Sequence, residues 1–414
     1  MRTFLSTIIF LTTWFGVMGA HNIELSMDEY LAKVLASNLG LACEKLNLDI
    51  SSADEEAARI FTDPTLSVEY ADNDDHRMQM GRSVSAELGY TWAPGKRGAR
   101  VNLARSEKEL QKALLNDFLR NLRCEALTAY CEAQKAARML QMASELATLA
   151  QDVARGDSLR LALGDLGEAT ALQTAIDARL AQADEASAKS DYFSALLTLN
   201  SFAGITSTDT LCVPTSDNLP TLNDIDPATM EETAVERRAD LQAALKNVEV
   251  AQRALTVEKK ERNMEFDLAL GYNYNTEVRN ELAPAPRFSG MTVGVGIPLK
   301  FSNSNKGAVK AATLKVEQAQ IEYTDAVAQV RREVAAAWFN YRRAVEVAQQ
   351  YADNIVEESE ATLTRYRELY SHGDISLMEY REMLQTQIAL RTAFIDARFN
   401  SETALIALYA AVGL

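Results

Sequence analysis

The feature that most constrains this chain is a pair of alternating strands that runs directly into a very long helical stretch. Over residues 266–275 apolar side chains alternate with small or polar ones, so an extended strand there has one apolar face. A strand of about ten residues is long enough to cross a bilayer at a tilt. The alternation returns over 290–298 after a segment rich in turn-forming residues, which predicts a hairpin. The alternating apolar residues are Phe266, Leu268, Leu270, Tyr272 and Tyr274, then Met291, Val293, Val295 and Ile297.

The segment that follows this hairpin has the periodicity of a long coiled-coil helix. From Tyr323 to Ile355 apolar and small residues recur in steps of four and three, which predicts a helix seam without a break. We expect a helical hairpin over about 305–412, with its turn at 373–376. Between Tyr323 and Ile355 the residues of this seam are Val327, Val330, Val334, Ala337, Tyr341, Ala344, Ala348 and Tyr351.

The first half of the chain carries the same order of elements. Strands are predicted at about 65–70 and 83–92, and the second ends in Trp92, an aromatic residue typical of a membrane interface. An alanine-rich seam, which lets helix backbones approach closely, then predicts a helical hairpin over about 100–203. Two shorter helices are expected upstream, over 25–60.

The turn of this first helical hairpin is predicted at 164–167. Gly164 is a candidate for a helix cap with left-handed backbone, and Asp165 is a candidate N-cap of the next helix.

The two halves align as a tandem duplication. Gly373 lies 209 residues after Gly164, whereas Leu268 lies 202 residues after Leu66, so one gap of seven residues in the strand region reconciles them. The predicted organisation is a signal peptide at 1–20, a first repeat at 21–205, a proline-containing linker at 206–229 and a second repeat at 230–414.

The first twenty residues have the layout of a secretory signal peptide, because Arg2 precedes an apolar core that ends in the small residues Gly19 and Ala20. No later run of eighteen or more apolar residues occurs, so a membrane crossing by this chain would have to use strands. The net charge of -16 argues against a nucleic-acid partner. It suits either a channel that attracts cations or a surface with ordinary solubility charge.

Few residues in the chain suggest a metal-binding or catalytic site. Residues 71–82 place His76, Met78 and Met80 among aspartates, which resembles a soft metal site, but a solvated acidic loop explains the same composition. We favour the loop, and expect no metal and no other cofactor. With only 3 histidines, the chain shows no nucleophile–base set and no phosphate loop, so we do not expect an enzyme.

Four strands per chain are too few for a membrane barrel, because single-chain barrels have about eight strands or more and lipid does not tolerate open strand edges. Other chains must therefore complete the sheet. Three copies would supply about twelve strands, and the long helices would continue the barrel as a tube.

With this order of strands and helices, the sequence resembles the TolC family of outer-membrane efflux ducts over its whole mature length. The duplicated order of two strands and a helical hairpin is the specific part of the resemblance. The residues around the second turn that fit the family's pattern are Arg365, Tyr370, Gly373, Ser376 and Leu384. The resemblance implies a mostly helical homotrimer with a twelve-stranded barrel and a helical periplasmic tunnel. It also implies a periplasmic adaptor and an inner-membrane pump as partners. The spacing and the tip sequence are most similar to the branch that serves heavy-metal and multidrug pumps of the resistance-nodulation-division type.

The resemblance assigns residues to a gate and to a docking surface. Tyr370 falls where the family has a gate tyrosine, and Glu379 and Glu382 fall where some members have an acidic ring at the periplasmic entrance; surface carboxylates are the alternative reading. Thr170 takes the place of an acid at the first tip. The tips that would dock the adaptor are Gly164, Asp165, Leu166 and Gly167, and Gly373, Asp374, Ile375 and Ser376.

The function implied is a passive exit duct in the outer membrane that extends into the periplasm. Many members carry a lipidated cysteine after the signal, but His21 and Asn22 stand there in this chain, so a lipid anchor is not expected. The alternative is a structural coiled-coil protein of the cell envelope that never crosses the membrane. Four alternating strands with aromatic ends favour the duct, since a coiled coil does not need them.

Overall fold

The computed structural model describes residues 21–74, 79–205, 210–215, 227–299, 305–351 and 353–413. The predicted signal peptide and the residues His76 and Met78 of the candidate metal loop lie outside these ranges. The chain divides into two compact units. Unit 1 comprises Met1–Leu39, Leu122–Asp224 and Ala337–Tyr409, and unit 2 comprises Gly40–Asn121, Ile225–Ala336 and Ala410–Leu414.

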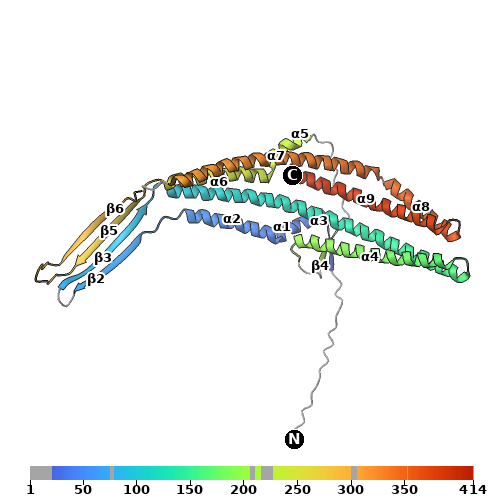
Figure 1. The fold of residues 1–414 in the computed structure, drawn as a ribbon, viewed down its shortest axis with the longest axis horizontal. Helices are drawn as coiled ribbons and strands as arrows, with labels where there is room; N and C mark the ends of the chain where they lie inside the picture. Colours follow the sequence, from blue (N-terminus) through green and yellow to red (C-terminus); the bar gives the residue numbers. More distant parts are fainter. Residues whose placement is uncertain are drawn as a thin grey trace, which may run out of the picture. The chain divides into compact units, whose positions relative to one another are not determined.

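Unit 2 contains a four-stranded antiparallel sheet of order β2-β3-β5-β6 (Figure 1). The register pairs apolar residues across neighbouring strands, for example Leu66 with Leu88, Leu88 with Leu270, and Leu270 with Val293. Side chains alternate between the two faces of a strand, so all of these residues lie on one face of the sheet. The strands are β2 (Thr65–Asp74), β3 (Gln79–Trp92), β5 (Phe266–Asn275) and β6 (Phe288–Gly296).

Helices extend from the ends of these strands (Figure 1). The helix after β3 begins beyond Pro94 and Gly95, where the positive φ of Gly95 (81°) turns the chain out of the sheet. The helices with residues in unit 2 are α2 (Leu39–Ala58), α3 (Lys96–Leu163), α5 (Pro227–Arg237), α6 (Ala239–Glu261) and α7 (Lys306–Gln350).

The described part of unit 1 contains the later parts of α3 and α7, four further helices and two strands. A small buried cluster of Cys131, Phe399 and Ile406 joins α3 to the last helix of the chain. The remaining elements of unit 1 are α1 (Met27–Ser37), α4 (Glu168–Phe202), α8 (Asp353–His372), α9 (Leu377–Val412), β1 (His21–Leu25) and β4 (Thr210–Pro214).

The range 206–229, which we expected to be a linker, contains the strand β4. This strand pairs in parallel with β1. The buried Asn200 side chain holds it to α4, because its Oδ1 accepts the Cys212 backbone N–H at 2.8 Å and its Nδ2 donates to the Cys212 carbonyl at 3.2 Å. Tyr130 donates to the Leu25 carbonyl at 2.9 Å and so ties β1 to α3. Polar side chains of the helices, rather than an alternating pattern in the strand, form this contact.

The expectation of an unbroken seam from Tyr323 to Ile355 was wrong. Helix α7 ends at Gln350 and α8 begins at Asp353. The Tyr351 backbone N–H donates to the Ala348 carbonyl at 3.2 Å, three residues back. In a continuous α-helix the acceptor would be the carbonyl four residues back. No described helix has a segment long and apolar enough to cross a bilayer.

Candidate functional site

The turn between α3 and α4 is a Schellman motif. Gly164 has a φ of 85°, and its N–H bonds the Leu161 carbonyl at 3.0 Å. The Asp165 N–H reaches back to the Arg160 carbonyl at 2.9 Å. A Cβ placed on Gly164 would meet nothing within 4 Å, so the left-handed backbone alone demands glycine there.

The turn between α8 and α9 has the same backbone hydrogen bonds. Gly373 has a φ of 83°, and its N–H bonds the Tyr370 carbonyl at 3.0 Å, while Asp374 bonds the Leu369 carbonyl at 2.9 Å. The surroundings of the two glycines differ. A Cβ on Gly373 would lie 3.5 Å from Nη2 of Arg160, because this second turn packs against the end of α3.

The helices that leave the two turns are capped differently. The Ser376 N–H and hydroxyl both bond Oε2 of Glu379, at 2.8 and 2.9 Å, and the Glu379 N–H returns to the Ser376 hydroxyl at 3.3 Å. This is a capping box, and its backbone hydrogen bond lowers the pKa of Glu379. The first turn lacks it: Gly167 is the N-cap of α4 and provides no side-chain hydrogen bond. The expectation that Asp165 caps α4 was therefore wrong.

Tyr370 forms a buried network with the end of α3. Its hydroxyl donates to Oδ2 of Asp157 at 2.6 Å. Tyr370 is 5% exposed and Asp157 is 2% exposed. Nη1 of Arg160 lies 3.6 Å from Oδ1 of Asp157 and donates to the Tyr370 carbonyl at 3.3 Å. The Tyr380 ring stacks on Tyr370 at 5.3 Å between ring centroids. Burial and then the Asp157 carboxylate raise the pKa of Tyr370, so the phenol keeps its proton at neutral pH.

The structure separates the three residues assigned to a gate. Tyr370 is buried in the network with Asp157 and Arg160, whereas Glu379 and Glu382 are exposed in the first turns of α9. Sequence reasoning missed Asp157 and Arg160, since their partner lies more than two hundred residues away and the duplication gives no matching pair: 209 residues after Asp157 stands Tyr366.

We expect Tyr370→Phe to loosen this network without unfolding the helices. The substitution removes a hydrogen bond to a buried carboxylate, an interaction worth about 1.5–3 kcal/mol. Amide hydrogen exchange should therefore become about tenfold faster or more in peptides that contain Asp157 and Tyr370. Tyr366→Phe is the matched control, because Tyr366 lies one turn earlier on α8 and its hydroxyl forms no hydrogen bond with the described residues. Equal exchange in the two variants would contradict the prediction.

Comparisons with known proteins agree with this architecture. Residues 232–414 match the family described as outer membrane efflux protein. The cobalt-zinc-cadmium resistance protein CzcC of Cupriavidus metallidurans is 23% identical over 301 residues, which are 72% of this chain and 68% of that protein.

Solved structures extend the likeness to nearly the whole chain. CusC, whose structures were described in terms of folding and transmembrane channel formation, has a TM-score of 0.73 at 16% identity, over 97% of this chain and 95% of that chain. The CmeC outer membrane channel of Campylobacter jejuni has a TM-score of 0.72 at 15% identity, over 94% of this chain and 85% of that chain. At these identities the likeness establishes the fold.

Proposed function

We propose that the chain is a member of the outer membrane efflux protein family, whose pattern residues 232–414 match, and that it forms the outer-membrane exit duct of a tripartite export system. In this proposal three copies form a barrel in the outer membrane, and their helices form a tunnel in the periplasm. A periplasmic adaptor and an inner-membrane pump deliver the substrate, and the duct conducts it passively.

The observation that carries the proposal is the two-faced sheet of unit 2. One face presents apolar side chains that are largely exposed, such as Leu66 (70%), Met291 (75%) and Val293 (78%). The other face carries small and polar residues such as Ser85, Thr292 and the strand glycines. An apolar outer face and a polar inner face are what a water-filled barrel in lipid requires. The other exposed apolar residues on this face are Val68, Tyr70, Val84, Leu88, Trp92, Leu268, Leu270, Tyr272, Tyr274 and Val295.

The edges of this sheet support a trimer. Among the described strands, β2 and β6 each have a single neighbour. Unpaired backbone groups are not tolerated in lipid, so the edge of one copy must pair with the edge of another. Three copies of a four-stranded sheet give about twelve strands, within the size range of outer-membrane barrels.

The backbone supports the tandem duplication behind this arrangement. The turns at Gly164 and Gly373 share their hydrogen bonds, and the helices α4 and α9 both end at a glycine of positive φ, Gly204 (68°) and Gly413 (83°). Each repeat thus supplies two strands and one helical hairpin. A trimer would present six similar turns in one ring, and we infer that this ring docks the adaptor.

The proposal is tested first by the oligomeric state. The purified protein should require detergent and should be a trimer by size-exclusion chromatography with light scattering, and it should form pores in planar bilayers. A monodisperse monomer without detergent would instead support a structural coiled-coil protein of the envelope.

We propose that the network of Tyr370, Asp157 and Arg160 holds the periplasmic entrance closed, and that Glu379 and Glu382 ring that entrance. Both carboxylates are exposed on α9, which supports their access to a lumen. Exposed carboxylates around a narrow opening would raise the local cation concentration.

The combined variant Glu379→Gln, Glu382→Gln is expected to weaken cation preference in planar bilayers under a salt gradient. Glutamine also fits the third helical position of a capping box, so the Ser376 cap survives while two charges per chain are removed. Reversal potentials measure the effect. The matched control is Glu357→Gln with Glu358→Gln on α8, which removes as many charges from another helix. An unchanged reversal potential in the α9 variant would place these carboxylates outside the pore.

The resistance protein CzcC suggests the substrate class. We propose that the export system handles divalent transition-metal cations, which an acidic entrance would admit. Cells that lack this chain should then grow less well in cobalt, zinc or cadmium salts. A deletion strain with normal metal tolerance and increased sensitivity to organic antibiotics would redirect the assignment to drug export.

A further inference from the structure

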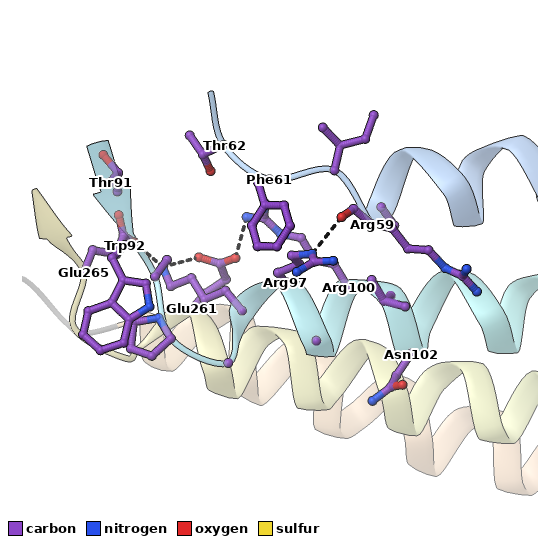
Figure 2. A pocket seen from close by; sticks show the side chains of 18 of the residues that line it. Arg59, Phe61, Thr62, Thr91, Trp92, Arg97, Arg100, Asn102, Glu261 and Glu265 are labelled. Atoms are coloured by element: carbon purple, nitrogen blue, oxygen red, sulfur yellow. Dashed lines mark hydrogen bonds and ion pairs between the residues drawn. The ribbon is translucent and has the colours of Figure 1, made fainter. Parts of the chain in front are cut away.

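A pocket of about 840 Å³ lies in unit 2 where the sheet meets the helices (Figure 2). Its walls come from the end of α2 and the segment after it, the end of β3, the first turns of α3 and the end of α6. None of the residues assigned above to the gate or to the two helix turns lines it.

One wall of the pocket is an ion-paired cluster. The Lys96 ammonium group, 5% exposed, lies between Glu265 and Glu261, with 2.7 Å to Oε2 of Glu261. Arg100 bonds the other oxygen of Glu261 at 2.8 Å (Figure 2). These ion pairs lower the pKa of Glu261, although burial opposes the shift. Two acids thus face two bases, and this wall carries no excess charge.

Basic groups are in excess beside the pocket, around Glu55, which does not itself line it; of the cations that surround Glu55, Arg59 lines the pocket. Glu55, at the end of α2, is shared by Arg59 at 2.6 Å, Lys108 at 3.3 Å and Arg105 at 3.5 Å. One carboxylate therefore faces three cations, in a chain whose net charge is -16. A local reversal of the overall charge marks a place where an anion is attracted.

Arg97 has no carboxylate partner among the described residues, and its side chain is nevertheless held in place. Its Nε donates to the Arg59 carbonyl at 2.8 Å, and its guanidinium carbon lies 3.7 Å from the centroid of the Phe61 ring. Figure 2 shows the two side chains together at the pocket. The described part of the chain offers no acceptor for the Nη groups of Arg97. A guanidinium fixed in this way presents a fork of donors that matches a phosphate.

The pocket is continuous with the apolar face of the sheet. Tyr90 and Trp92 line it and lie on that face at the end of β3. Ile60 and Phe61, on the segment after α2, are 68% and 62% exposed. Aromatic residues at a strand end mark the level of the lipid headgroups. A basic pocket thus opens beside the apolar surface that would face acyl chains.

We propose that this pocket binds the phosphate group of a phospholipid of the inner leaflet, with Arg97 and Arg100 as donors and the acyl chains along Trp92 and the neighbouring apolar face. This inference rests on the proposed insertion of the sheet in the outer membrane. The apolar continuation selects a lipid over free phosphate, because an inorganic ion would gain nothing from Tyr90, Trp92 and Phe61. The bound headgroup fixes the depth of the sheet in the bilayer.

Native mass spectrometry of the protein released from nanodiscs of phosphatidylglycerol and phosphatidylcholine tests the proposal. Wild-type protein should retain phosphatidylglycerol, and Arg97→Gln should reduce the retained lipid about tenfold. Arg97→Lys keeps the charge but loses the fork, and should fall between the two. Arg253→Gln on α6, outside the pocket, removes the same charge and should retain lipid as the wild type does.

Three results would overturn the lipid site: equal retention in Arg97→Gln and wild type, an equal loss in Arg253→Gln, or displacement of the retained lipid by excess inorganic phosphate. The last would identify a free-anion site. Pore formation measured on the same preparations keeps the two proposals apart. Wild-type protein without pores would refute the duct, whereas normal pores without any phosphatidylglycerol retention would refute the lipid site alone.

Discussion

Cells that carry Val293→Arg should hold about tenfold less assembled trimer in the outer membrane, or even less, than wild-type cells. Val293 lies in the middle of β6, is 78% exposed and pairs with Leu270 on the apolar face. An arginine near the middle of a bilayer on the lipid face of a barrel costs about 2–4 kcal/mol, and a trimer carries the substitution three times. Native gels of fractionated membranes measure the remaining trimer.

The matched control for this prediction is Thr292→Arg. Thr292 is the preceding residue of the same strand, so its side chain points to the opposite, polar face. It lies across from Gly271, which has no side chain to obstruct an arginine. Assembly should therefore stay near the wild-type level, while conductance falls because a bulky cation enters the lumen. If both variants lose trimer equally, the assignment of the two faces is wrong.

The strand pattern shows how far sequence reasoning reaches in the sheet. The predicted strand at 266–275 has the same bounds as β5, because its alternation of apolar and polar residues spans its whole length. Strand β3 begins at Gln79, four residues before the predicted 83, and β2 continues to Asp74 beyond the predicted 70. Polar ladder pairs such as Asp72 with Arg82 extend both strands, and hydrophobic periodicity does not report such pairs.

The helix turns were predictable in their backbone and not in their side-chain contacts. Glycine followed by aspartate at two equivalent places indicated left-handed caps, and both glycines have positive φ. The position of the N-cap was missed at the first turn, because Gly167 contributes no side chain that a capping rule could detect. The Tyr370–Asp157 hydrogen bond joins helices of different repeats, so no local pattern announces it.

The basic pocket was also invisible in the sequence. No periodic pattern or motif pointed to Arg97 or Phe61 as parts of a site. Their pairing depends on a segment without regular structure, residues 59–64, that carries Phe61 over the start of α3. Propensity and periodicity describe single elements, whereas this site exists only where the ends of α2, β3, α3 and α6 meet.

Gly373→Val is expected to abolish export while the trimer still assembles. A residue with a Cβ costs about 1–2 kcal/mol in the left-handed region, and more when it is β-branched, so the turn at φ 83° would be distorted. The valine methyl groups would also extend toward Arg160, which lies 3.5 Å from the ideal Cβ position. Arg160 holds Asp157 and the Tyr370 carbonyl, so docking and the closed network would fail together. Metal and antibiotic sensitivity of the cells measures export, and native gels measure the trimer.

Two variants separate backbone strain from the loss of the Arg160 contact. Gly164→Val imposes the same strain at φ 85° with nothing within 4 Å, so it should impair docking and leave the closed network intact. Gly307→Ala, in helix α7 with open space around it, should behave as wild type. Docking is measured by cross-linking to the adaptor from Asp374→Cys. Asp374 is chosen because it is exposed and because Ser376 is needed for the helix cap. The exposed Cys43 is replaced by serine in all of these variants. Normal export by Gly373→Val, or a cysteine at 374 that never captures an adaptor, would show that these turns are not the docking surface.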